Sequence, residues 1–488
     1  MTKERIRVMK FGGTSVGDAA CIRRAAEIIA AAAAEGPVVA VVSAMSGVTN
    51  RLIEAAQASS TGNRRLAAEL AERLREQHQT AIEALVSDAH RRTELSGETE
   101  KIIEHVTGLC YGTALLRELT PRVLDEILST GERLSARLLA NTLCEMGLKS
   151  RAVEATELIV TDNVSGRAEP LMEQTKVKAA ARLLPLLEDD SVPVVTGFIG
   201  ATAEGMLTTL GRGGSDYSAT ILGGALDAAE VIIWTDVDGV LTADPRLVAD
   251  ARTLREISYN EAAELAYFGA KVLHPKTLRP VSEAGIPVWI RNSFAPERHG
   301  TKITATGHPT ARGVKAITAI GNVSLITVGG RGIVGLPGVA GKTFTAVASA
   351  EANILLISQS SSQNDICFVI NSDDEARTVE KLRQAFAIDL AHKAIEHITV
   401  NPEIAIVAVV GERMRGLLGI AGRTFSALGR RGVNIIAIAQ GSSEYNVSFV
   451  VEAGMMREAV QSLHSEFGLQ RRASRFESVT GESAMATV

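Results

Sequence analysis

The chain has 488 residues, of which 46% are hydrophobic and 22% are charged, as is ordinary for a soluble globular protein of two to four domains. The net charge of −5 argues against a general nucleic-acid or anionic-membrane surface, and no apolar run reaches membrane-spanning length. The N-terminus resembles no signal sequence, and the four cysteines have neither zinc-site nor disulfide spacing. We therefore expect a cytoplasmic protein with no metal site of its own and no nucleic-acid or membrane partner.

The first part of the chain alternates short apolar runs with helical segments. Continuous apolar strands separated by helices are typical of a mostly parallel sheet that is buried on both faces. The long segment 51–147 is helical in pattern and elaborates this sheet. We therefore expect a three-layer αβα domain over residues 1–300, followed by a polar linker that contains Gly and Pro. The strand-like runs cover residues 5–11, 37–44, 192–200, 231–236 and 287–292.

The C-terminal part contains an internal repeat. Residues 338–370 align without gaps to residues 419–451, and Gly338 and Gly419 are 81 positions apart. This spacing indicates a duplicated domain rather than a solenoid. Each copy has the order strand, helix, strand, strand, helix, which is the split βαβ arrangement of a ferredoxin-like fold.

The two copies differ in their last strand. The first copy continues into the strand-like run 393–400, whereas the second ends in the charged tail 471–488 without a convincing strand. A spare strand-like segment, 314–320, precedes the first copy. We infer that this segment pairs into the second copy, so that the first copy is inserted within it. The predicted domains are residues 314–395 and 396–470.

Polar and small residues collect where the predicted strands of the first domain end. In an open α/β sheet, ligands bind beyond the carboxyl ends of the strands. Taken singly, these residues could be turn glycines, helix caps or solvated side chains; together they predict a binding site. They are Lys10, Gly12, Gly13, Thr14 and Ser15 after the first strand, Ser43 and Thr49 after the second, and Thr235 and Asp236 after the fourth.

These residue types suit phosphoryl transfer. Glycines let backbone N–H groups approach phosphate oxygens, and a lysine such as Lys10 can neutralise charge on a transferring phosphoryl group. The segment "GRGGSDYSA" adds Arg212, a natural clamp for a carboxylate, and Asp216. The segment "WTDVDGVLTADPR" adds further acids and Arg246. Phosphoryl transfer needs positioning and charge neutralisation, and we expect Mg²⁺ to arrive on the nucleotide.

At this point the sequence resembles the aspartate kinases of the amino acid kinase family. The motifs "KFGGTSV", "STGERLSA", "GRGGSDYSA", "WTDVDGV", "DPR" and "FGAKVLHP" occur in the family's order, and the repeats resemble ACT domains. The resemblance runs over nearly the whole chain. It implies ATP-dependent phosphorylation of the side-chain carboxylate of L-aspartate to 4-phospho-L-aspartate, the first step towards lysine, threonine and methionine.

The resemblance also assigns roles to individual positions. Leu241 departs from the pattern, since several relatives have a tyrosine near the adenine. The implied roles are Lys10 on the nucleotide phosphates and the transition state, Ser43 and Thr49 lining the aspartate pocket, Glu132 on the substrate amino group, Arg212 on its α-carboxylate with Asp216 beside it, and Thr235, Asp236, Arg246 and Lys271 on the nucleotide.

The repeats predict regulation by a small amino acid. Gln359 and Gln440 occupy equivalent strand ends, and each precedes a serine-rich turn that contains Ser361 or Ser442. A glutamine amide both donates and accepts hydrogen bonds, although it could simply satisfy the turn backbone. The resemblance is strongest to threonine-responsive enzymes, including the kinase half of fusions with homoserine dehydrogenase, so threonine is the favoured effector and lysine the other candidate.

Two other functions stay open at this stage. One is another small-molecule kinase of the same fold, acting on glutamate, acetylglutamate or a nucleoside monophosphate, and the repeats argue against it. The other is a catalytically inactive amino-acid sensor, which the presence of Lys10, Arg212 and Asp216 argues against. Because ACT-like sheets have exposed edges, we also expect a homodimer or a larger oligomer joined through residues 314–470.

Overall fold

A computed structural model describes residues 6–269, 273–308, 313–330, 338–359, 365–412, 414, 417–439 and 445–470. The chain forms two compact units. The first comprises residues up to Val240 together with Thr253–Pro309, and the second comprises Leu241–Arg252 and the residues from Thr310 onward. In the part of the chain that the structure describes, no helix combines the length and the apolarity that crossing a membrane requires.

The first unit is built on an eight-stranded sheet with the order β3-β4-β2-β1-β7-β9-β10-β8. All neighbouring pairs are parallel except β9 and β10. This is the mostly parallel sheet that the sequence predicts. The strands are β1 (Arg7–Phe11), β2 (Val38–Val42), β3 (Ser150–Val153), β4 (Val192–Thr196), β7 (Glu230–Thr235), β8 (Glu256–Ser258), β9 (Val288–Asn292) and β10 (Thr301–Thr304).

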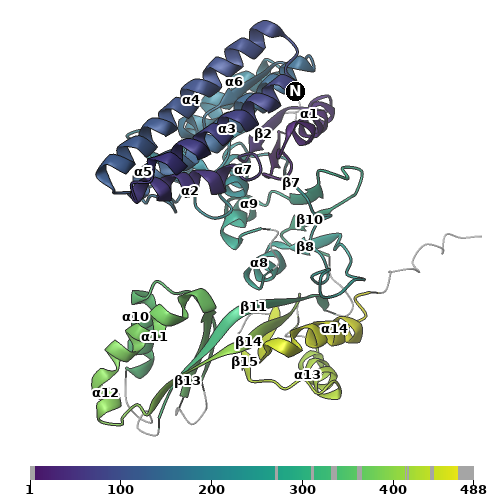
Figure 1. Ribbon diagram of the computed structural model, residues 1–488. Coiled ribbons are helices and arrows are strands. Elements are labelled where there is room, and N and C mark those ends of the chain that lie inside the picture. The colour runs from purple at the N-terminus through teal and green to yellow at the C-terminus, as the bar shows by residue number, and fades with distance from the viewer. Residues whose placement is uncertain are drawn as a thin grey trace, which may run out of the picture. The chain divides into compact units, whose positions relative to one another are not determined.

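Helices cover both faces of this sheet. One face packs against the first five helices in a single apolar core, and Figure 1 shows the long helices of that layer lying side by side. On the other face, α7 contacts β1, β2 and β7 and also packs against α6 and α9. The helices are α1 (Ala19–Ala33), α2 (Val48–Ser60), α3 (Arg64–Leu85), α4 (Ala89–Leu116), α5 (Pro121–Glu145), α6 (Met172–Glu188), α7 (Gly214–Ala225), α8 (Tyr259–Tyr267) and α9 (Arg279–Ala284).

Local sequence explains where several of these elements begin. Asp18, Asn63, Asp88 and Thr120 each accept a hydrogen bond from a backbone N–H in the first turn of the following helix.

The predicted strand 192–200 is divided in the structure. Its second part joins a separate antiparallel pair formed by β5 (Ile199–Ala201) and β6 (Leu207–Thr209).

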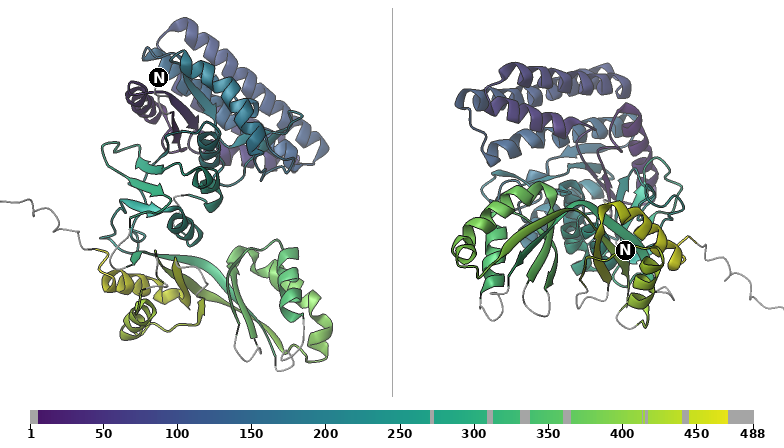
Figure 2. Two further views of the ribbon diagram at one scale, coloured as in Figure 1. Left: turned by 180° about the vertical axis from the view of Figure 1, so that it is seen from behind. Right: turned by 60° about the horizontal axis from the view of Figure 1, so that its bottom comes forward.

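The second unit has one antiparallel sheet of six strands, with the order β12-β13-β11-β14-β16-β15. Its helices form two groups at opposite ends of this sheet (Figure 2). The strands are β11 (Val314–Gly329), β12 (Ile354–Gln359), β13 (Asp365–Asn371), β14 (His397–Gly411), β15 (Ala437–Ala439) and β16 (Asn446–Glu452), and the helices are α10 (Val339–Ser349), α11 (Glu375–Ala385), α12 (Ala387–Ala391), α13 (Ile420–Arg430) and α14 (Met456–Glu466).

The two central strands each serve both halves of this sheet. The first part of β11, 314–320, pairs with 406–411 of β14, next to β16 of the second repeat. The later part, 323–329, pairs with β13 of the first repeat and with 397–404 of β14. Because both strands continue across the junction, the two ferredoxin-like halves share a single sheet.

Candidate active site at the carboxyl ends of the strands

A buried ion pair lies at the end of β1. Lys10 Nζ is 2.6 Å from Asp216 Oδ1, and Lys10 is only 8% exposed. Asp216 lies in the first turn of α7, so two residues 206 positions apart meet where strand and helix converge. A buried lysine requires such a partner, because an isolated charge is costly to remove from water. The structure thus places a fixed cation at the sheet edge where the sequence predicts a phosphate site.

A second buried carboxyl lies close by, on α5. Glu132 is 4% exposed, and its Oε2 has no hydrogen-bond partner among the residues that the structure describes. Burial raises the pKa of Glu132 to about 8, although the Ala44 backbone N–H and the charge of Lys10 oppose this rise. An acid in such a place is suited to receive a cationic group, whose arrival would restore the ionised form.

Close packing explains two of the glycines around this acid. A Cβ on Gly131 would lie 2.5 Å from the Ala44 Cβ, and a Cβ on Gly13 would lie 3.0 Å from the Ala44 carbonyl oxygen. Neither position has room for a side chain without a shift of the loop after β2. The glycines therefore let β1, β2 and α5 approach one another at the site.

Hydroxyl groups connect the loop after β1 to the neighbouring strands. Ser15 Oγ lies 2.8 Å from Ser293 Oγ and donates to the Trp234 carbonyl oxygen at 3.3 Å. Ser293 Oγ in turn donates to the Thr235 carbonyl oxygen at 3.1 Å. Sequence reasoning missed Ser293, although its position directly after the strand-ending pair Arg-Asn is a signal that could have identified it.

The loop after β7 is held by polar contacts of its own. Thr235 Oγ1 donates to Asp236 Oδ1 at 3.2 Å, and Asn292 Nδ2 donates to Asp238 Oδ1 at 2.7 Å. Arg298 also pairs with Asp238. Asp236 is itself exposed, so its carboxylate is available to a ligand at the carboxyl end of β7.

The other predicted residues of the first unit lie on the same edge of the sheet. Ser43 and Thr49 are half-buried at the end of β2 and in the first turn of α2, and Thr14 is exposed. Arg212 is exposed in the turn before α7. The pKa of His274 is lowered by burial and by the nearby charge of Arg212.

The other predicted residues belong to the second unit or lie outside the described residues. Arg246 belongs to the second unit, where its guanidinium pairs with Asp244 at 2.5 Å. Gln359 ends β12 and is exposed. Lys271, Gln440, Ser361 and Ser442 lie outside the described residues.

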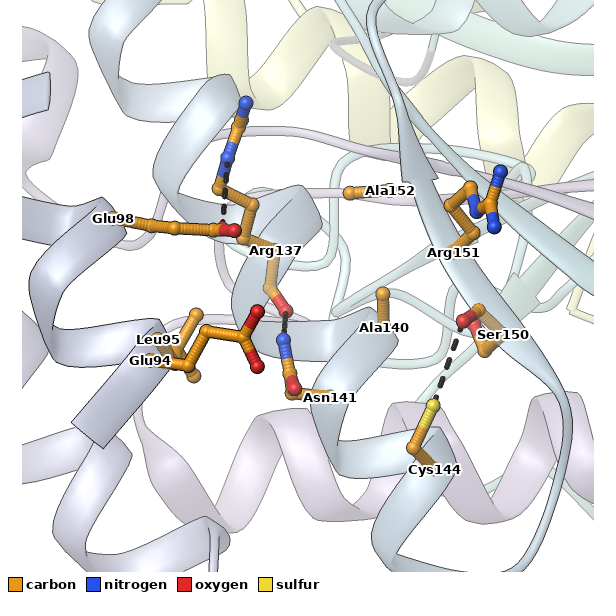
Figure 3. Close-up of a pocket in the computed structure, with 10 residues that line it drawn as sticks. All are labelled: Glu94, Leu95, Glu98, Arg137, Ala140, Asn141, Cys144, Ser150, Arg151 and Ala152. Atoms are coloured by element: carbon orange, nitrogen blue, oxygen red, sulfur yellow. Dashed lines mark hydrogen bonds and ion pairs between the residues drawn. The ribbon is translucent and has the colours of Figure 1, made fainter. Parts of the chain in front are cut away.

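A separate cavity of about 290 Å³ opens between α4, α5 and β3 (Figure 3). Two of its polar contacts join lining residues: Arg137 pairs with Glu98 at 3.5 Å, and Asn141 Nδ2 donates to the Arg137 carbonyl oxygen at 3.0 Å. None of the predicted site residues lines it. The cavity therefore contributes nothing to the candidate active site.

Comparison with known protein families agrees with this geometry. The family model "Amino acid kinase family" matches residues 5–292, which include Lys10, Glu132 and Asp216 of the candidate site. The chain belongs to the amino acid kinase family. An ACT domain model matches residues 326–386 and 407–467, and these ranges contain the two copies of the repeat.

Similar proteins narrow the family to the aspartokinases. Chloroplastic aspartokinase 1 of Arabidopsis thaliana is 35% identical over 472 residues, which are 94% of this chain and 80% of that protein. The bifunctional aspartokinase/homoserine dehydrogenase 1 of the same plant is 35% identical over 95% of this chain but only 51% of its own length. The chain thus spans about half the length of the bifunctional relatives that it matches.

Solved structures show the same fold. Aspartokinase III of E. coli in complex with aspartate and ADP has a TM-score of 0.79 and 32% identity, covering 94% of this chain and 99% of that one. The same protein in complex with lysine and aspartate has a TM-score of 0.77 and 32% identity, covering 95% of this chain and 99% of that one. The predicted fold, an amino acid kinase domain followed by ACT domains, is confirmed.

Proposed function

We propose that this chain is an aspartate kinase, which transfers the γ-phosphoryl group of ATP to the side-chain carboxylate of L-aspartate and so begins the synthesis of lysine, threonine and methionine. The observation that carries the proposal is the pairing of Lys10 with Asp216 beside the buried acid Glu132. The Lys10 ammonium can bind the transferring phosphoryl group, and the Glu132 carboxyl can bind an ammonium group. The two together suit a substrate that has both a reacting carboxylate and an ammonium group. The E. coli relative crystallised with aspartate and ADP supports the same pair of ligands.

In the proposed reaction, an oxygen of the aspartate side chain attacks the γ-phosphorus, and the bond between that phosphorus and the bridging oxygen of ADP breaks. The products are 4-phospho-L-aspartate and ADP. Lys10 neutralises the charge that develops on the transferring group, and Asp216 holds the Lys10 ammonium in place. Because the pair is already formed, the site requires little reorganisation during the reaction.

The remaining residues of the site bind and orient the two substrates. Glu132 receives the α-ammonium group of aspartate, and Arg212 forms a bidentate pair with its α-carboxylate. Ser43 and Thr49 line the same pocket, and Thr235 and Asp236 contact the nucleotide together with the glycine turn after β1. The roles of Arg246 and Lys271 in nucleotide binding remain predictions drawn from the resemblance.

Mg²⁺ would enter on the nucleotide in this proposal. Within the described residues, no group of three histidine, cysteine, aspartate or glutamate side chains is placed to hold a metal ion. The phosphate oxygens would then supply most of the ligands, as is common for Mg²⁺ in kinases. The ion would neutralise charge on the phosphates, while the residues of the chain orient the acceptor.

An assay of ADP release tests the proposal against both alternatives. The purified chain is given MgATP with aspartate, glutamate or acetylglutamate, and ADP is measured by a coupled reaction. We expect release with aspartate alone. Release with either of the other acceptors would indicate another kinase of the family, and no release with any acceptor would indicate a sensor without activity.

We further propose that the ACT domains bind an amino acid that inhibits the kinase, most readily threonine, with lysine as the other candidate. Gln359 ends β12 at the position equivalent to Gln440, and the E. coli relative was crystallised with lysine. Threonine, lysine and methionine are each titrated against the wild type, Gln359→Ala and Gln440→Ala. Threonine inhibition that weakens in either variant, with the basal activity unchanged, supports the proposal. Inhibition by lysine alone would make lysine the effector. No response to any of the three amino acids would refute regulation through the ACT domains.

The second unit is also our proposed oligomer interface. The edge strands β12 and β15 expose Ile357 and Ile438, which are 48% and 45% exposed and occupy equivalent places in the two repeats. Apolar edge strands are usually covered in solution. Light scattering at micromolar concentration should show a dimer or a larger oligomer, and a monomer would refute this proposal.

A further inference from the structure

A short segment of the kinase sequence is built into the core of the second unit. Residues 241–252 fall inside the range matched by the amino acid kinase model, yet they pack with the second ACT repeat. Ala243 and Val248 are 4% and 5% exposed and belong to the same apolar cluster as Val407 and Phe449. We call residues 241–252 the docked segment.

Three side chains of α14 bind the docked segment. His464 Nε2 lies 3.0 Å from Thr242 Oγ1, Gln461 Nε2 donates to the Leu247 carbonyl oxygen at 2.7 Å, and Arg457 Nη1 donates to the Arg246 carbonyl oxygen at 2.9 Å. The spacing of four and then three residues places them on one face of the helix. One helix face thus holds the docked segment at three successive points.

Thr242 is the centre of these contacts. It is 5% exposed, and its carbonyl oxygen accepts from the Ile317 N–H of β11 at 2.9 Å. Its N–H donates to the Arg252 carbonyl oxygen at 2.8 Å, and its Oγ1 accepts from the Arg252 N–H at 3.0 Å. These bonds close the docked segment into a hairpin and attach it to the sheet.

The first repeat provides an internal control for these side chains. Helix α11 is equivalent to α14 at the same offset of 81 residues, and Leu382 and Leu463 are both fully buried at equivalent positions. The three binding positions differ, however, because α11 has Ala376, Glu380 and Arg383 where α14 has Arg457, Gln461 and His464. The shared fold therefore requires the buried leucine but not the three polar side chains.

The docked segment is joined to the candidate site by a short stretch of chain. Four residues, 237–240, separate it from Asp236 at the end of β7. Within the first unit, the Val240 N–H donates to Thr301 Oγ1 at 2.9 Å, and the Leu254 N–H donates to the Val240 carbonyl oxygen at 2.8 Å. These bonds fasten both ends of the docked segment next to the loop that follows Thr235 and Asp236.

We propose that Arg457, Gln461 and His464 are positioning residues for the nucleotide, which act by holding the docked segment and with it the loop after β7. The inference rests on the proposed function of Thr235 and Asp236 as nucleotide contacts. It makes the second ACT repeat, rather than the first, the one that sets nucleotide affinity. Loss of these contacts should weaken nucleotide binding and leave aspartate binding nearly unchanged.

Surface substitutions on α14 test the proposal without disturbing the core. Arg457→Ala/Gln461→Ala removes two exposed side chains from α14. Glu380→Ala/Arg383→Ala, which removes two exposed side chains from the equivalent face of α11, is the control. Calorimetry with MgADP should show a Kd raised about tenfold in the first variant, since two hydrogen bonds are lost, and unchanged in the control. In kinetics, KM should rise for ATP but stay within about twofold for aspartate. Wild-type MgADP affinity, or equal shifts for both substrates, would overturn the proposal.

Substitutions at Thr242 provide a second test. Thr242→Val removes the hydroxyl at nearly constant volume, whereas Thr242→Ser keeps it. We expect weaker MgADP binding in the valine variant and wild-type binding in the serine variant; equal affinity in the two would overturn the proposal. A wild type that binds MgADP but releases no ADP with aspartate would refute the proposed function alone, because the calorimetric comparison of the variants would still be valid. A wild type that does not bind MgADP would refute both the proposed function and this inference.

Discussion

The buried carboxyl of Glu132 should make aspartate binding strongly dependent on pH. Burial raises its pKa to about 8, so the free enzyme holds this acid mostly protonated at neutral pH. Binding of the aspartate ammonium favours the ionised form, so binding releases a proton. Affinity should therefore increase as the pH rises towards 8 and level off above it.

The size of this effect follows from the ionised fraction of Glu132. With a pKa of about 8, that fraction increases about 25-fold between about pH 6.5 and about pH 8.5. The KM for aspartate should fall by a similar factor, whereas the KM for ATP should change little. Coupled ADP-release assays at several pH values, with each substrate varied in turn, measure both constants.

Two variants make the prediction specific to this acid. Glu132→Gln keeps the shape but cannot ionise, so its KM for aspartate should be high and nearly independent of pH. Glu126→Gln, six residues earlier on the same helix, should keep the wild-type profile. A flat wild-type profile, or a Glu132→Gln profile that still falls with pH, would show that Glu132 does not receive the ammonium group.

Three further predictions concern the same edge of the sheet. Lys10→Ala should lower kcat by about two to three orders of magnitude, because it removes the cation at the phosphoryl group; near-normal turnover would exclude that role. Arg212→Lys should raise the KM for aspartate much more than the KM for ATP, since lysine lacks the planar fork, and equal effects would make Arg212 a nucleotide or structural residue. Gly131→Ala should lower the melting temperature despite the roughly 1 kcal/mol that alanine gains over glycine in a helix, because the new methyl group would lie 2.5 Å from the Ala44 Cβ. Gly108→Ala on α4, where a Cβ meets nothing within 4 Å, should raise it, and the opposite order in calorimetry would contradict this packing argument.

Local patterns were enough to predict the main elements. The apolar runs at 37–44 and 231–236 became the buried strands β2 and β7, because short β-branched runs suit strands that are covered on both faces of a parallel sheet. The constant offset of the repeat likewise predicted two related halves, since equivalent sequences form equivalent strands and helices. Sequence also indicated that Lys10 and Asp216 belong to one site, because ligands bind where parallel strands end.

Other features were decided only by the tertiary structure. The sequence around Glu132 does not distinguish it from an exposed glutamate on a helix. Its pKa is raised because the packing of α5 against the loop after β2 buries its carboxyl group. Ser293 joins Ser15 to Thr235 across strands that are distant in sequence.

The docked segment is the clearest case of this kind. It lies within the kinase sequence, yet its apolar side chains are buried with the second repeat, and helix α14 satisfies its carbonyl groups. Burial and hydrogen bonding depend on which distant elements meet, and neither composition nor periodicity within one segment carries that information. The sequence by itself therefore determined the elements and the chemistry at the strand ends, and the packing determined which side chains are buried, paired and held in position.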